Sequence, residues 1–557
     1  MIIGIDLGTT NSLVSYFDKE KGAVIIPNRL GSKITPSVVS FDENGTIYVG
    51  QTAKERRITN PGQTVEVFKR DMGSSRKWNI GGREYTPTDL SALILRTLKE
   101  DAENFLSEKV EEAVISVPAY FNEYQRKATK LAGKLAGLKV ERIISEPTAA
   151  AIAYGIDKCE DNVKIMVFDL GGGTFDVSLL ELDDGIMEVH CVAGDNYLGG
   201  EDFTKVIYNK FIKDNQLEEE LLSLQTKNHI SKQAENCKLA LSNNHTSVMK
   251  CKINDEMIEM IYSREEFEDD CAELLERLKK PITRSLRDSK MTIEDIDKVV
   301  MVGGSTKLPL VRAYVAKLMK KMPDYSVNPD EVVAIGACMQ AAMKERNEAV
   351  EDIILTDVCP YTLGIGIHNR NGDSLIYSPI IQRNTTIPAS RTRSYCTVTD
   401  YQTEVKVTIY QGENRLVNNN LLIDELSIVV PPNKAGMENI EVTFTYDINS
   451  LLEVIVKSKT TNEEVRRIIR SSTCDISDEE AMARFAALEY LKLPPREQEE
   501  NKLVLFKAEE LYEELLGKER EELAYYISVF EGVLENGEPE EIEAARENMR
   551  KVLDYYG

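Results

Sequence analysis

The sequence predicts an α/β domain followed by an antiparallel β-domain and a small helical domain. Over residues 1–350, short apolar strands alternate with amphipathic helical segments, a pattern typical of sheets covered by helices. Over residues 358–472, apolar residues recur at every second position, as in half-buried antiparallel strands. Residues 473–557 return to helical spacing. A short apolar segment, residues 351–357, links the first two domains.

The length and charge of the chain limit its possible functions. Its 557 residues are too many for one hydrophobic core, and the net charge of −25 argues against a nucleic-acid partner, because phosphate backbones require clustered Lys and Arg. Nine cysteines without a C-x-x-C pair indicate reduced thiols, not a zinc site or disulfide framework. There is no signal-peptide pattern and no apolar run that could span a bilayer. We therefore expect a cytoplasmic protein without a membrane partner, and we expect a monomer.

In the first domain, three mainly apolar runs predict buried strands at residues 114–117, 164–168 and 298–302. Residues 123–136 carry Ala and Leu at helical spacing, which predicts an amphipathic helix. These elements fit sheets that are covered on their faces.

The later domains have their own periodicities. Apolar residues alternate with polar ones over 405–409, 440–446 and 452–456, with a polar turn at 447–450, which predicts antiparallel strands. Further on, Ser477 and Glu480 match a capping box, and the helix that they begin should end at Leu493, before two prolines. Two or three more helices should follow, separated by Gly517 and Gly537.

An internal repeat is the most informative feature of the sequence. Residues 2–18 (IIGIDLGTTNSLVSYFD) and 165–182 (IMVFDLGGGTFDVSLLEL) each contain a strand, Asp-Leu-Gly, a tight turn and a second strand. Glycines let backbone N–H groups approach phosphate oxygens, and Asp6 and Asp169 at the strand ends can hold hydrated Mg²⁺. Two such hairpins facing each other predict a nucleotide clamped between two related lobes.

One Gly-rich turn alone could equally be a plain β-hairpin. The matching Asp positions in two copies favour the phosphate interpretation. The sequence contains neither the Walker A pattern GxxxxGK[ST] nor the Rossmann pattern GxGxxG, which disfavours those nucleotide folds. A third glycine turn, residues 302–307 (VGGSTK), follows an apolar strand and fits as a third wall of the site.

Motifs along nearly the whole chain resemble the DnaK-type seventy-kilodalton heat-shock chaperones. They are DLGTTNS (6–12), VPAYFNEYQRKAT (117–129), ISEPTAAAIAYG (144–155), FDLGGGTFDVS (168–178), AGDNYLGGEDF (193–203), VGGSTKLP (302–309), NPDEVVAIGA (328–337), DVCPYTLGI (357–365) and NTTIP (384–388). The linker LTDVCP (355–360), the compact length and the short tail are similar to the HscC branch. The resemblance implies an actin-like ATPase of two related lobes, an antiparallel β-sandwich and an α-helical lid.

What the resemblance implies for function is ATP-dependent chaperone activity, in which ATP binding and hydrolysis control the binding and release of unfolded polypeptide. It implies Mg²⁺ as a cofactor, held through water by Asp6 and Asp169, and allows K⁺. The implied catalytic residues are Asp6, Lys69, Glu146, Asp169, Thr174 and Asp176. The implied nucleotide-binding residues are Gly8, Thr9, Thr10, Asn11, Gly171, Gly172, Gly173, Gly199, Gly200, Glu235, Lys238, Ser242, Gly303, Gly304, Ser305, Lys307 and Asp330.

Some of these residues have a plainer interpretation when taken alone. Lys69 would be a solvated surface lysine and Glu146 a turn residue before proline; the motifs around them carry the assignment. On the adenosine side the chain departs from the family, because Leu239 and Lys307 stand where two arginines often sandwich the adenine. We expect weaker or less selective adenine binding.

The resemblance also assigns the residues that couple the domains. Pro118 and Arg126 match a switch pair, although Pro118 could simply end a strand. The linker residues Ile353, Ile354, Leu355 and Asp357 would dock on the nucleotide domain, and apolar side chains are unusual on a passive spacer. Five residues match the peptide groove, with an ordinary sandwich core as the alternative: Ile365, Tyr395, Val398, Val405 and Val407.

The expected partners are extended or unfolded polypeptides and a J-domain co-chaperone that binds near Arg142. Ser145, where Asn is often found, could alter the choice of J-protein. Dependence on a GrpE-like exchange factor is doubtful, because segments 69–85 and 242–264 are shorter than in typical relatives.

Other functions compete with this one. A sugar or acetate kinase of the same fold would not need residues 351–557, and a filament-forming relative would end near residue 350. A regulatory peptide-binding module that barely hydrolyses ATP is disfavoured by the intact set of Asp6, Lys69, Glu146, Asp169 and Thr174.

Overall fold

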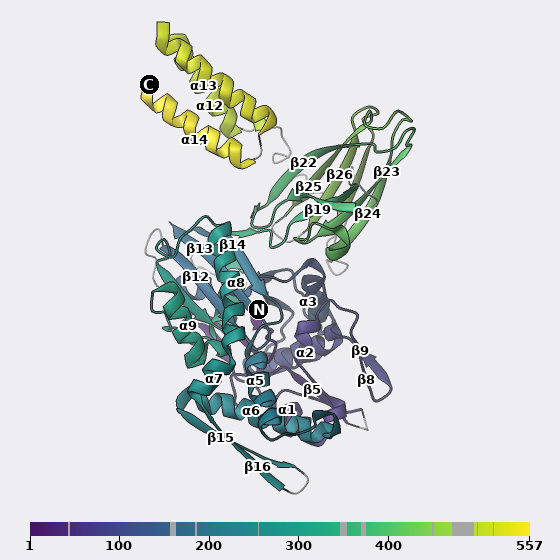
Figure 1. Ribbon diagram of the computed structural model, residues 1–557, viewed down its shortest axis with the longest axis vertical. Coiled ribbons are helices and arrows are strands. Elements are labelled where there is room, and N and C mark those ends of the chain that lie inside the picture. Colours follow the sequence, from purple (N-terminus) through teal and green to yellow (C-terminus); the bar gives the residue numbers. More distant parts are fainter. Residues whose placement is uncertain are drawn as a thin grey trace.

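The first domain of the chain consists of two lobes built on related sheets (Figure 1). The computed structural model describes residues 1–42, 45–155, 163–183, 186–253, 256–345, 354–368, 375–447, 451–469, 495–497, 499–515, 517–537 and 539–556. In each lobe a central strand has a parallel neighbour on one side and the second strand of its own hairpin on the other. The sequence repeat is therefore also a structural repeat.

The sheet of lobe I has the strand order β11-β10-β1-β2-β3, with β4 paired to β2. Its elements are β1 (Ile2–Asp6), β2 (Asn11–Asp18), β3 (Gly22–Ile26), β4 (Thr35–Pro36), β10 (Glu112–Val117), β11 (Ile143–Ser145), and the helices α2 (Pro87–Leu106), α3 (Glu123–Leu135) and α4 (Glu146–Gly155). Smaller sheets with a helix extend this lobe: β5 (Val38–Phe41), β6 (Ile47–Val49), β7 (Thr64–Glu66), β8 (Trp78–Ile80), β9 (Arg83–Tyr85) and α1 (Gln51–Thr59).

The sheet of lobe II has the order β17-β12-β13-β14, and β18 and β21 of the following segment extend it. Its strands are β12 (Val163–Leu170), β13 (Phe175–Asp183), β14 (Ile186–Asp195) and β17 (Lys298–Val302), and a hairpin is formed by β15 (Thr246–Ile253) and β16 (Glu256–Ser263). Its helices are α5 (Gly200–Asp214), α6 (Leu224–Asn243), α7 (Arg264–Asp270), α8 (Ala272–Asp288), α9 (Pro309–Met319) and α10 (Val332–Lys344).

Glycines allow α10 to pack closely against both β1 and α4. A Cβ on Gly4 of β1 would lie 2.3 Å from the backbone nitrogen of Cys338, and a Cβ on Gly336 would lie 1.8 Å from the carbonyl oxygen of Ala149. Side chains at these positions would clash with backbone, which cannot move aside. The two glycines thus fix the distance between the helices and the sheet.

The predicted elements of this domain are present. The runs at 114–117, 164–168 and 298–302 lie within β10, β12 and β17. The helix predicted at 123–136 is α3, which begins after Asn122, because the Asn122 side chain accepts from the backbone N–H of Gln125 at 3.0 Å.

The β-domain is a sandwich of two antiparallel sheets, with orders β20-β19-β23-β24 and β22-β25-β26-β27 among the described residues. The strands are β18 (Ile354–Val358), β19 (Leu363–His368), β20 (Leu375–Ile381), β21 (Thr386–Ile387), β22 (Ala389–Cys396), β23 (Glu404–Gln411), β24 (Leu421–Val429), β25 (Asn439–Tyr446), β26 (Leu452–Ser458) and β27 (Glu464–Ile469). The alternation predicted at 405–409, 440–446 and 452–456 corresponds to β23, β25 and β26, and their inward side chains form one core.

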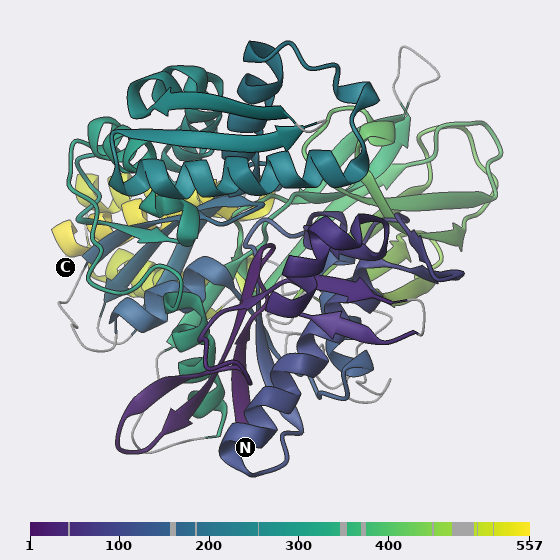
Figure 2. The same ribbon diagram turned by 90° about the horizontal axis from the view of Figure 1, so that it is seen from below.

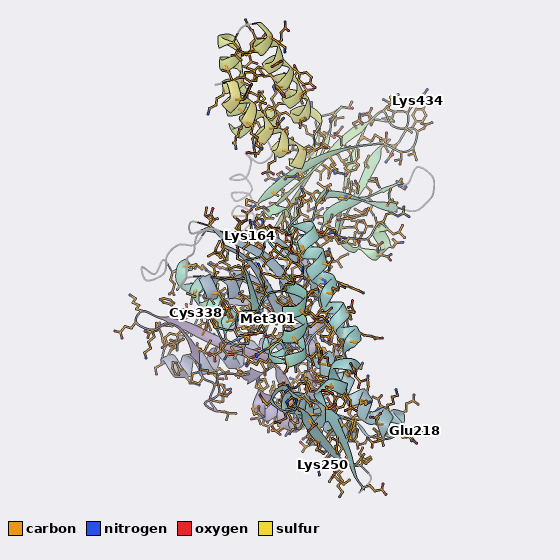
Figure 3. All side chains as sticks on the ribbon, turned by 60° about the vertical axis from the view of Figure 1, so that its left-hand side comes forward. Lys164, Glu218, Lys250, Met301, Cys338 and Lys434 are labelled. Carbon is orange, nitrogen blue, oxygen red and sulfur yellow. The ribbon has the colours of Figure 1, made fainter. Side chains whose placement is uncertain are left out.

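The described carboxyl-terminal residues form helices α12 (Glu499–Glu514), α13 (Gly517–Asn536) and α14 (Pro539–Tyr556) around their own apolar core, drawn in yellow in Figure 1. The capping box and helix predicted at Ser477–Leu493 lie outside the described residues. In Figure 3, Lys250 of β15 lies near the end of the molecule that is opposite to the carboxyl-terminal helices, and Lys434 marks the β-domain. Within the described part of the chain, no helix is long and apolar enough to cross a membrane.

Candidate functional site

A cavity of about 670 Å³ lies between the two lobes, which face each other in Figure 2. Most of the predicted nucleotide residues line it. These are Asp6, Gly8, Thr9, Thr10, Asn11, Lys69, Glu146, Asp169, Gly171, Gly172, Thr174, Gly200, Glu235, Lys238, Ser242, Gly303, Gly304, Ser305, Lys307 and Asp330. Three predicted residues are not among those that line the cavity: Gly173, Gly199 and Asp176.

The two hairpin turns pack directly on each other at one end of the cavity. A Cβ on Gly172 would lie 2.4 Å from the Thr10 side chain, and a Cβ on Gly199 would lie 2.5 Å from the Gly172 backbone. Gly303 has φ +83° and leaves no room for a Cβ beside Leu170. The glycines therefore keep the backbone accessible, as a phosphate-binding cradle requires.

Lys69 and Glu146 form a buried ion pair at the cradle. The Lys69 Nζ donates to the Glu146 Oε1 at 2.8 Å, and the side chains of Lys69 and Glu146 are 3% and 10% exposed. Lys69 also lies over the ring of Phe121, with Nζ 5.6 Å from the ring centroid. An ammonium held by one carboxylate in a cavity retains donors for a second, anionic group.

Three further carboxylates crowd the same place. Burial, and after it the charge of Glu146, raises the pKa of Asp6 to about 7, although Asp6 accepts from the Ser116 hydroxyl at 2.8 Å. Burial likewise raises the pKa of Asp169 well above its usual value and that of Asp176 to about 8. These groups repel one another because they are close and desolvated.

This carboxylate cluster fits a bound cation. Asp169 Oδ2 is buried and has no hydrogen-bond partner among the described residues. Buried oxygens without partners are costly, and a hydrated divalent ion would satisfy them. Among all the residues that the structure describes, no group of three or more His, Cys, Asp or Glu side chains is arranged to hold a metal ion.

The other end of the cavity is formed by α6 and the turn after β17. Lys238 Nζ donates to the Gly200 carbonyl at 2.8 Å and the Thr204 hydroxyl at 2.7 Å. Lys307 is ion-paired with Asp330. Leu239 lines the cavity and is 56% exposed, so this end of the cavity carries an apolar side chain.

Sequence reasoning missed several charged residues that line this end: Lys54, Arg57, Glu66, Glu201 and Arg312. Arg57 Nη1 donates to both carboxylate oxygens of Glu66, at 2.9 and 2.8 Å. A helix rich in Lys and Arg, such as α1, ordinarily indicates a solvated surface. No motif distinguishes the one arginine that points inward.

Ion pairs join the lobes across the cavity. Lys54 of α1 contacts Glu235 of α6 at 3.0 Å, and Arg70 contacts Asp202 of α5 at 2.5 Å. Arg70 Nε also donates to the Gly173 carbonyl at 2.8 Å, beside the second cradle. Because these ion pairs cross the cavity, the distance between the lobes should depend on whether the cavity is occupied.

The Hsp70 protein family model matches residues 2–80 and 75–554 of the chain, which is nearly its whole length. The chain belongs to the Hsp70 family. Hsp70 proteins are ATP-dependent chaperones: they are ATPases that use nucleotide and Mg²⁺, and they bind unfolded polypeptide clients and co-chaperones. The family architecture is an actin-like ATPase, a β-sandwich and a helical lid, and the two lobes, sandwich and helices described above agree with it.

In this Hsp70 chain, residues 354–357 of the predicted linker belong to β18, which extends the sheet of lobe II. β18 pairs in parallel with β14, with Ile354, Leu355 and Thr356 opposite Ile186, Met187 and Glu188. The far end of β18 pairs with β21, with Asp357 opposite Ile387. Backbone hydrogen bonds thus run from lobe II through the linker into the β-domain. Ile353 lies outside the described residues.

Asp357 and the predicted switch residues lie together. Burial raises the pKa of the Asp357 carboxyl, and the charges of Arg126 and Arg142 oppose this effect. Arg126 donates to the carbonyls of Ala119 at 3.1 Å and Phe121 at 3.2 Å, in the turn that follows Pro118. The cluster therefore touches the linker on one side and the chain beside the cavity on the other.

The β-domain contacts the ATPase domain through polar side chains that the sequence did not single out. Arg383 donates to Asp288 of α8 at 2.8 and 3.1 Å. Asn384 accepts from the Val192 N–H at 3.1 Å, and the Tyr124 hydroxyl donates to the Leu422 carbonyl at 2.8 Å. All three contacts join residues far apart in sequence, so only the fold reveals them.

The predicted peptide-groove residues have different environments. Ile365 and Val407 are buried in the sandwich core, and Tyr395 and Val405 are partly buried against it. Val398 lies beyond β22 and is 49% exposed. The Tyr395 hydroxyl is 3.0 Å from the Ser378 hydroxyl, across the two sheets. The groove assignment therefore stays a prediction.

Proposed function

We propose that ATP binding and hydrolysis between the lobes control, through β18, the binding and release of extended polypeptide segments by the β-sandwich. The observation that carries this proposal is the pairing of β18 with β14 on one side and β21 on the other. Because β18 is paired with both domains, it should respond when lobe II moves relative to lobe I. The nucleotide cavity and the peptide site of the sandwich can then both shift the equilibrium between a docked and an undocked β18, as coupling requires.

The residues of the cavity would act by positioning and charge. The two glycine turns, with Thr9, Thr10 and Asn11, would bind the phosphates, and Lys69, held by Glu146, would neutralise the terminal phosphate and orient water. Glu146, Thr174 and Asp176 would position that water. Bound Mg²⁺, held through water by Asp6 and Asp169, supplies positive charge against the phosphate oxygens. We also propose K⁺ as a further cofactor.

Asp357 is the linker residue on which coupling would depend most. Its carboxylate faces two arginine charges in a partly buried place, where ion pairs are screened less than at the surface. Arg126 would transmit the state of the cavity through the turn after Pro118. Ile353, Ile354 and Leu355 would add apolar contacts in the docked state.

The proposed ligand of the sandwich is an extended, aliphatic-rich peptide segment bound near Ile365, Tyr395, Val398, Val405 and Val407. Burying one aliphatic side chain contributes about 1.5–3 kcal/mol, so affinity for a short peptide should be modest. The helices α12, α13 and α14 would form the lid.

The branch of the family, the cellular location, the oligomeric state and the co-chaperones are proposed from the sequence. We propose membership of the HscC branch, a cytoplasmic monomer and a J-domain partner that binds near Arg142; dependence on a GrpE-like factor is not part of the proposal. Partial burial of Arg142 beside Asp357 supports a J-domain contact that is sensitive to linker docking.

The test is the fluorescence anisotropy of a labelled unstructured peptide bound to the full chain, followed after addition of Mg²⁺-ATP. We expect rapid release from the wild type and no accelerated release from Asp357→Asn or Leu355→Asp. Glu464→Gln, an exposed change on β27, is the matched control and should release as the wild type does.

Two outcomes would contradict the proposal. Peptide that stays bound in the wild type whatever the nucleotide would indicate a decoupled binding module. ATP turnover without any peptide binding would indicate a small-molecule phosphotransferase.

A further inference from the structure

The guanidinium of Arg57 is buried at the cavity with part of its hydrogen-bonding capacity unused. Arg57 is 6% exposed and lines the cavity from α1. Its Nη1 donates to Glu66, but Nε and Nη2 have no hydrogen-bond partner among the described residues. Nη2 is 3.8 Å from the Glu235 carboxylate, near enough for charge attraction and too far for a hydrogen bond. Buried charged donors without acceptors are costly, which points to a bound ligand group.

The position of Arg57 indicates which part of a nucleotide it would meet. Lys238 Nζ donates to the Gly200 carbonyl, and Gly200 N–H donates to the Gly171 carbonyl at 3.0 Å, in the phosphate cradle. Glu235 is one turn before Lys238 on α6, and Arg57 faces Glu235 from the opposite lobe. The group next to the phosphates in a nucleotide is the sugar.

The chemistry of these side chains also favours the sugar. Each hydroxyl of a ribose 2′,3′-diol can donate one hydrogen bond and accept others, and Arg57 offers donors beside the carboxylate acceptor of Glu235. The carboxylates of Glu66 and Glu235 would repel an additional phosphate. The flat base suits the apolar side chain of Leu239, the residue after Lys238.

We propose that Arg57 binds the ribose diol of the nucleotide, donating from Nε and Nη2 to the hydroxyl oxygens while Glu235 accepts from them. This inference rests on the proposed function, because the nucleotide must occupy this cavity. Lobe I thereby holds the sugar from the side opposite to α6. Arg57 becomes a specificity-determining residue that favours ribonucleotides over deoxynucleotides.

The test is calorimetric binding of Mg²⁺-ADP, 2′-deoxy-ADP and 3′-deoxy-ADP to the full chain, which needs no hydrolysis. The variants are Arg57→Met and the double variant Arg57→Met/Glu66→Gln. The double variant also removes the Glu66 carboxylate, which would otherwise lose its ion-pair partner Arg57. The matched control is Arg56→Met: the neighbouring Arg56 donates to Ser40 and Phe41 and does not line the cavity. Thermal unfolding of each variant shows that it is folded.

A hydrogen bond to a charged donor changes affinity by about tenfold or more. The wild type and Arg56→Met should therefore bind at least one deoxy analogue about tenfold more weakly than ADP. Both Arg57 variants should bind ADP about tenfold more weakly than the wild type. Their affinities for ADP and for the deoxy analogues should differ by about threefold or less. Equal wild-type affinity for ADP and both analogues would overturn the inference, as would Arg57 variants that discriminate like the wild type. A wild type that binds no ADP would instead refute the proposed function itself.

Discussion

The Tyr361 hydroxyl, in the β-domain, donates to the backbone carbonyl of Tyr120, in the ATPase domain, at 2.8 Å. The two rings also pack together, with centroids 4.3 Å apart. Tyr120 lies near Asp176, because a Cβ on Gly194 would meet both the Asp176 carboxylate and the Cβ of Tyr120. Burial raises the pKa of Tyr361 above its usual range, and the charge of Asp176 adds to this rise. A tyrosine of the β-domain thus lies within electrostatic reach of a predicted catalytic carboxylate.

Tyr361→Leu should therefore weaken docking of the linker. The change removes a partly buried hydrogen bond and an aromatic pair, each worth about 0.5–1.5 kcal/mol. We expect faster amide hydrogen exchange in β18 with ATP bound and slower release of bound peptide. Tyr401→Leu removes an exposed tyrosine of the same domain and serves as the control. Unchanged β18 exchange in Tyr361→Leu would show that this contact does not hold the domains together.

Arg383 and Asp288 should act as one unit across the same interface. Asp288 is 12% and Arg383 25% exposed, so their pair is desolvated enough to matter. We expect Arg383→Ala and Asp288→Ala each to accelerate β18 exchange, and the double variant to resemble either single one. The coupling energy should be about 1 kcal/mol or more. Additive effects in the double variant would mean that the two side chains act independently.

The pair of glycine turns that face each other at the cavity could be predicted from sequence because its determinants are local. A strand, an Asp and a run of glycines lie within a few residues at both β1–β2 and β12–β13, so periodicity and glycine chemistry are sufficient. The alternation in β23 and β25 likewise predicted a sandwich, since one face of each strand must be buried.

The remaining features depend on contacts between distant segments. The apolar linker was recognised, but its parallel pairing with β14 requires knowing which edge of lobe II is open. Arg57 could not be separated from Arg56, because burial of one and not the other depends on how α1 lies against α6. Ile365 and Val407 show the same limit, since alternation cannot distinguish a core from a groove.

The stability of the nucleotide-free protein should fall as pH rises. The pKa of Asp176 rises from 3.8 to about 8 on folding, so between these values the native state binds a proton that the unfolded state has lost. Stability therefore decreases with pH across this window. We expect the melting temperature in EDTA to drop between about pH 5 and about pH 8, and Asp176→Asn to reduce the slope. Glu464→Gln should keep the wild-type slope, and an equal slope in Asp176→Asn would contradict the assignment.

Lys69→Met should abolish most hydrolysis while sparing nucleotide binding. It removes the one ammonium that is ion-paired with Glu146, and preorganised charges of this kind contribute about 10²–10³ in rate. Single-turnover hydrolysis should fall by about that factor, whereas ADP affinity should change by only a few-fold, since the glycine turns remain. Melting curves confirm folding. Hydrolysis at the wild-type rate would remove Lys69 from the proposed catalytic set.

Leu239→Arg should strengthen adenine binding. Leu239 lines the cavity with a half-exposed aliphatic side chain, and on the other side Lys307 is engaged with Asp330. A guanidinium over the base would add a stacking contact of about 0.5–2 kcal/mol, which corresponds to roughly twofold to thirtyfold in affinity. Titration with ADP and GDP measures both affinity and selectivity. Lys307→Arg, which keeps the charge beside Asp330, should add a smaller gain. An unchanged ADP affinity in Leu239→Arg would mean that the base does not lie against α6.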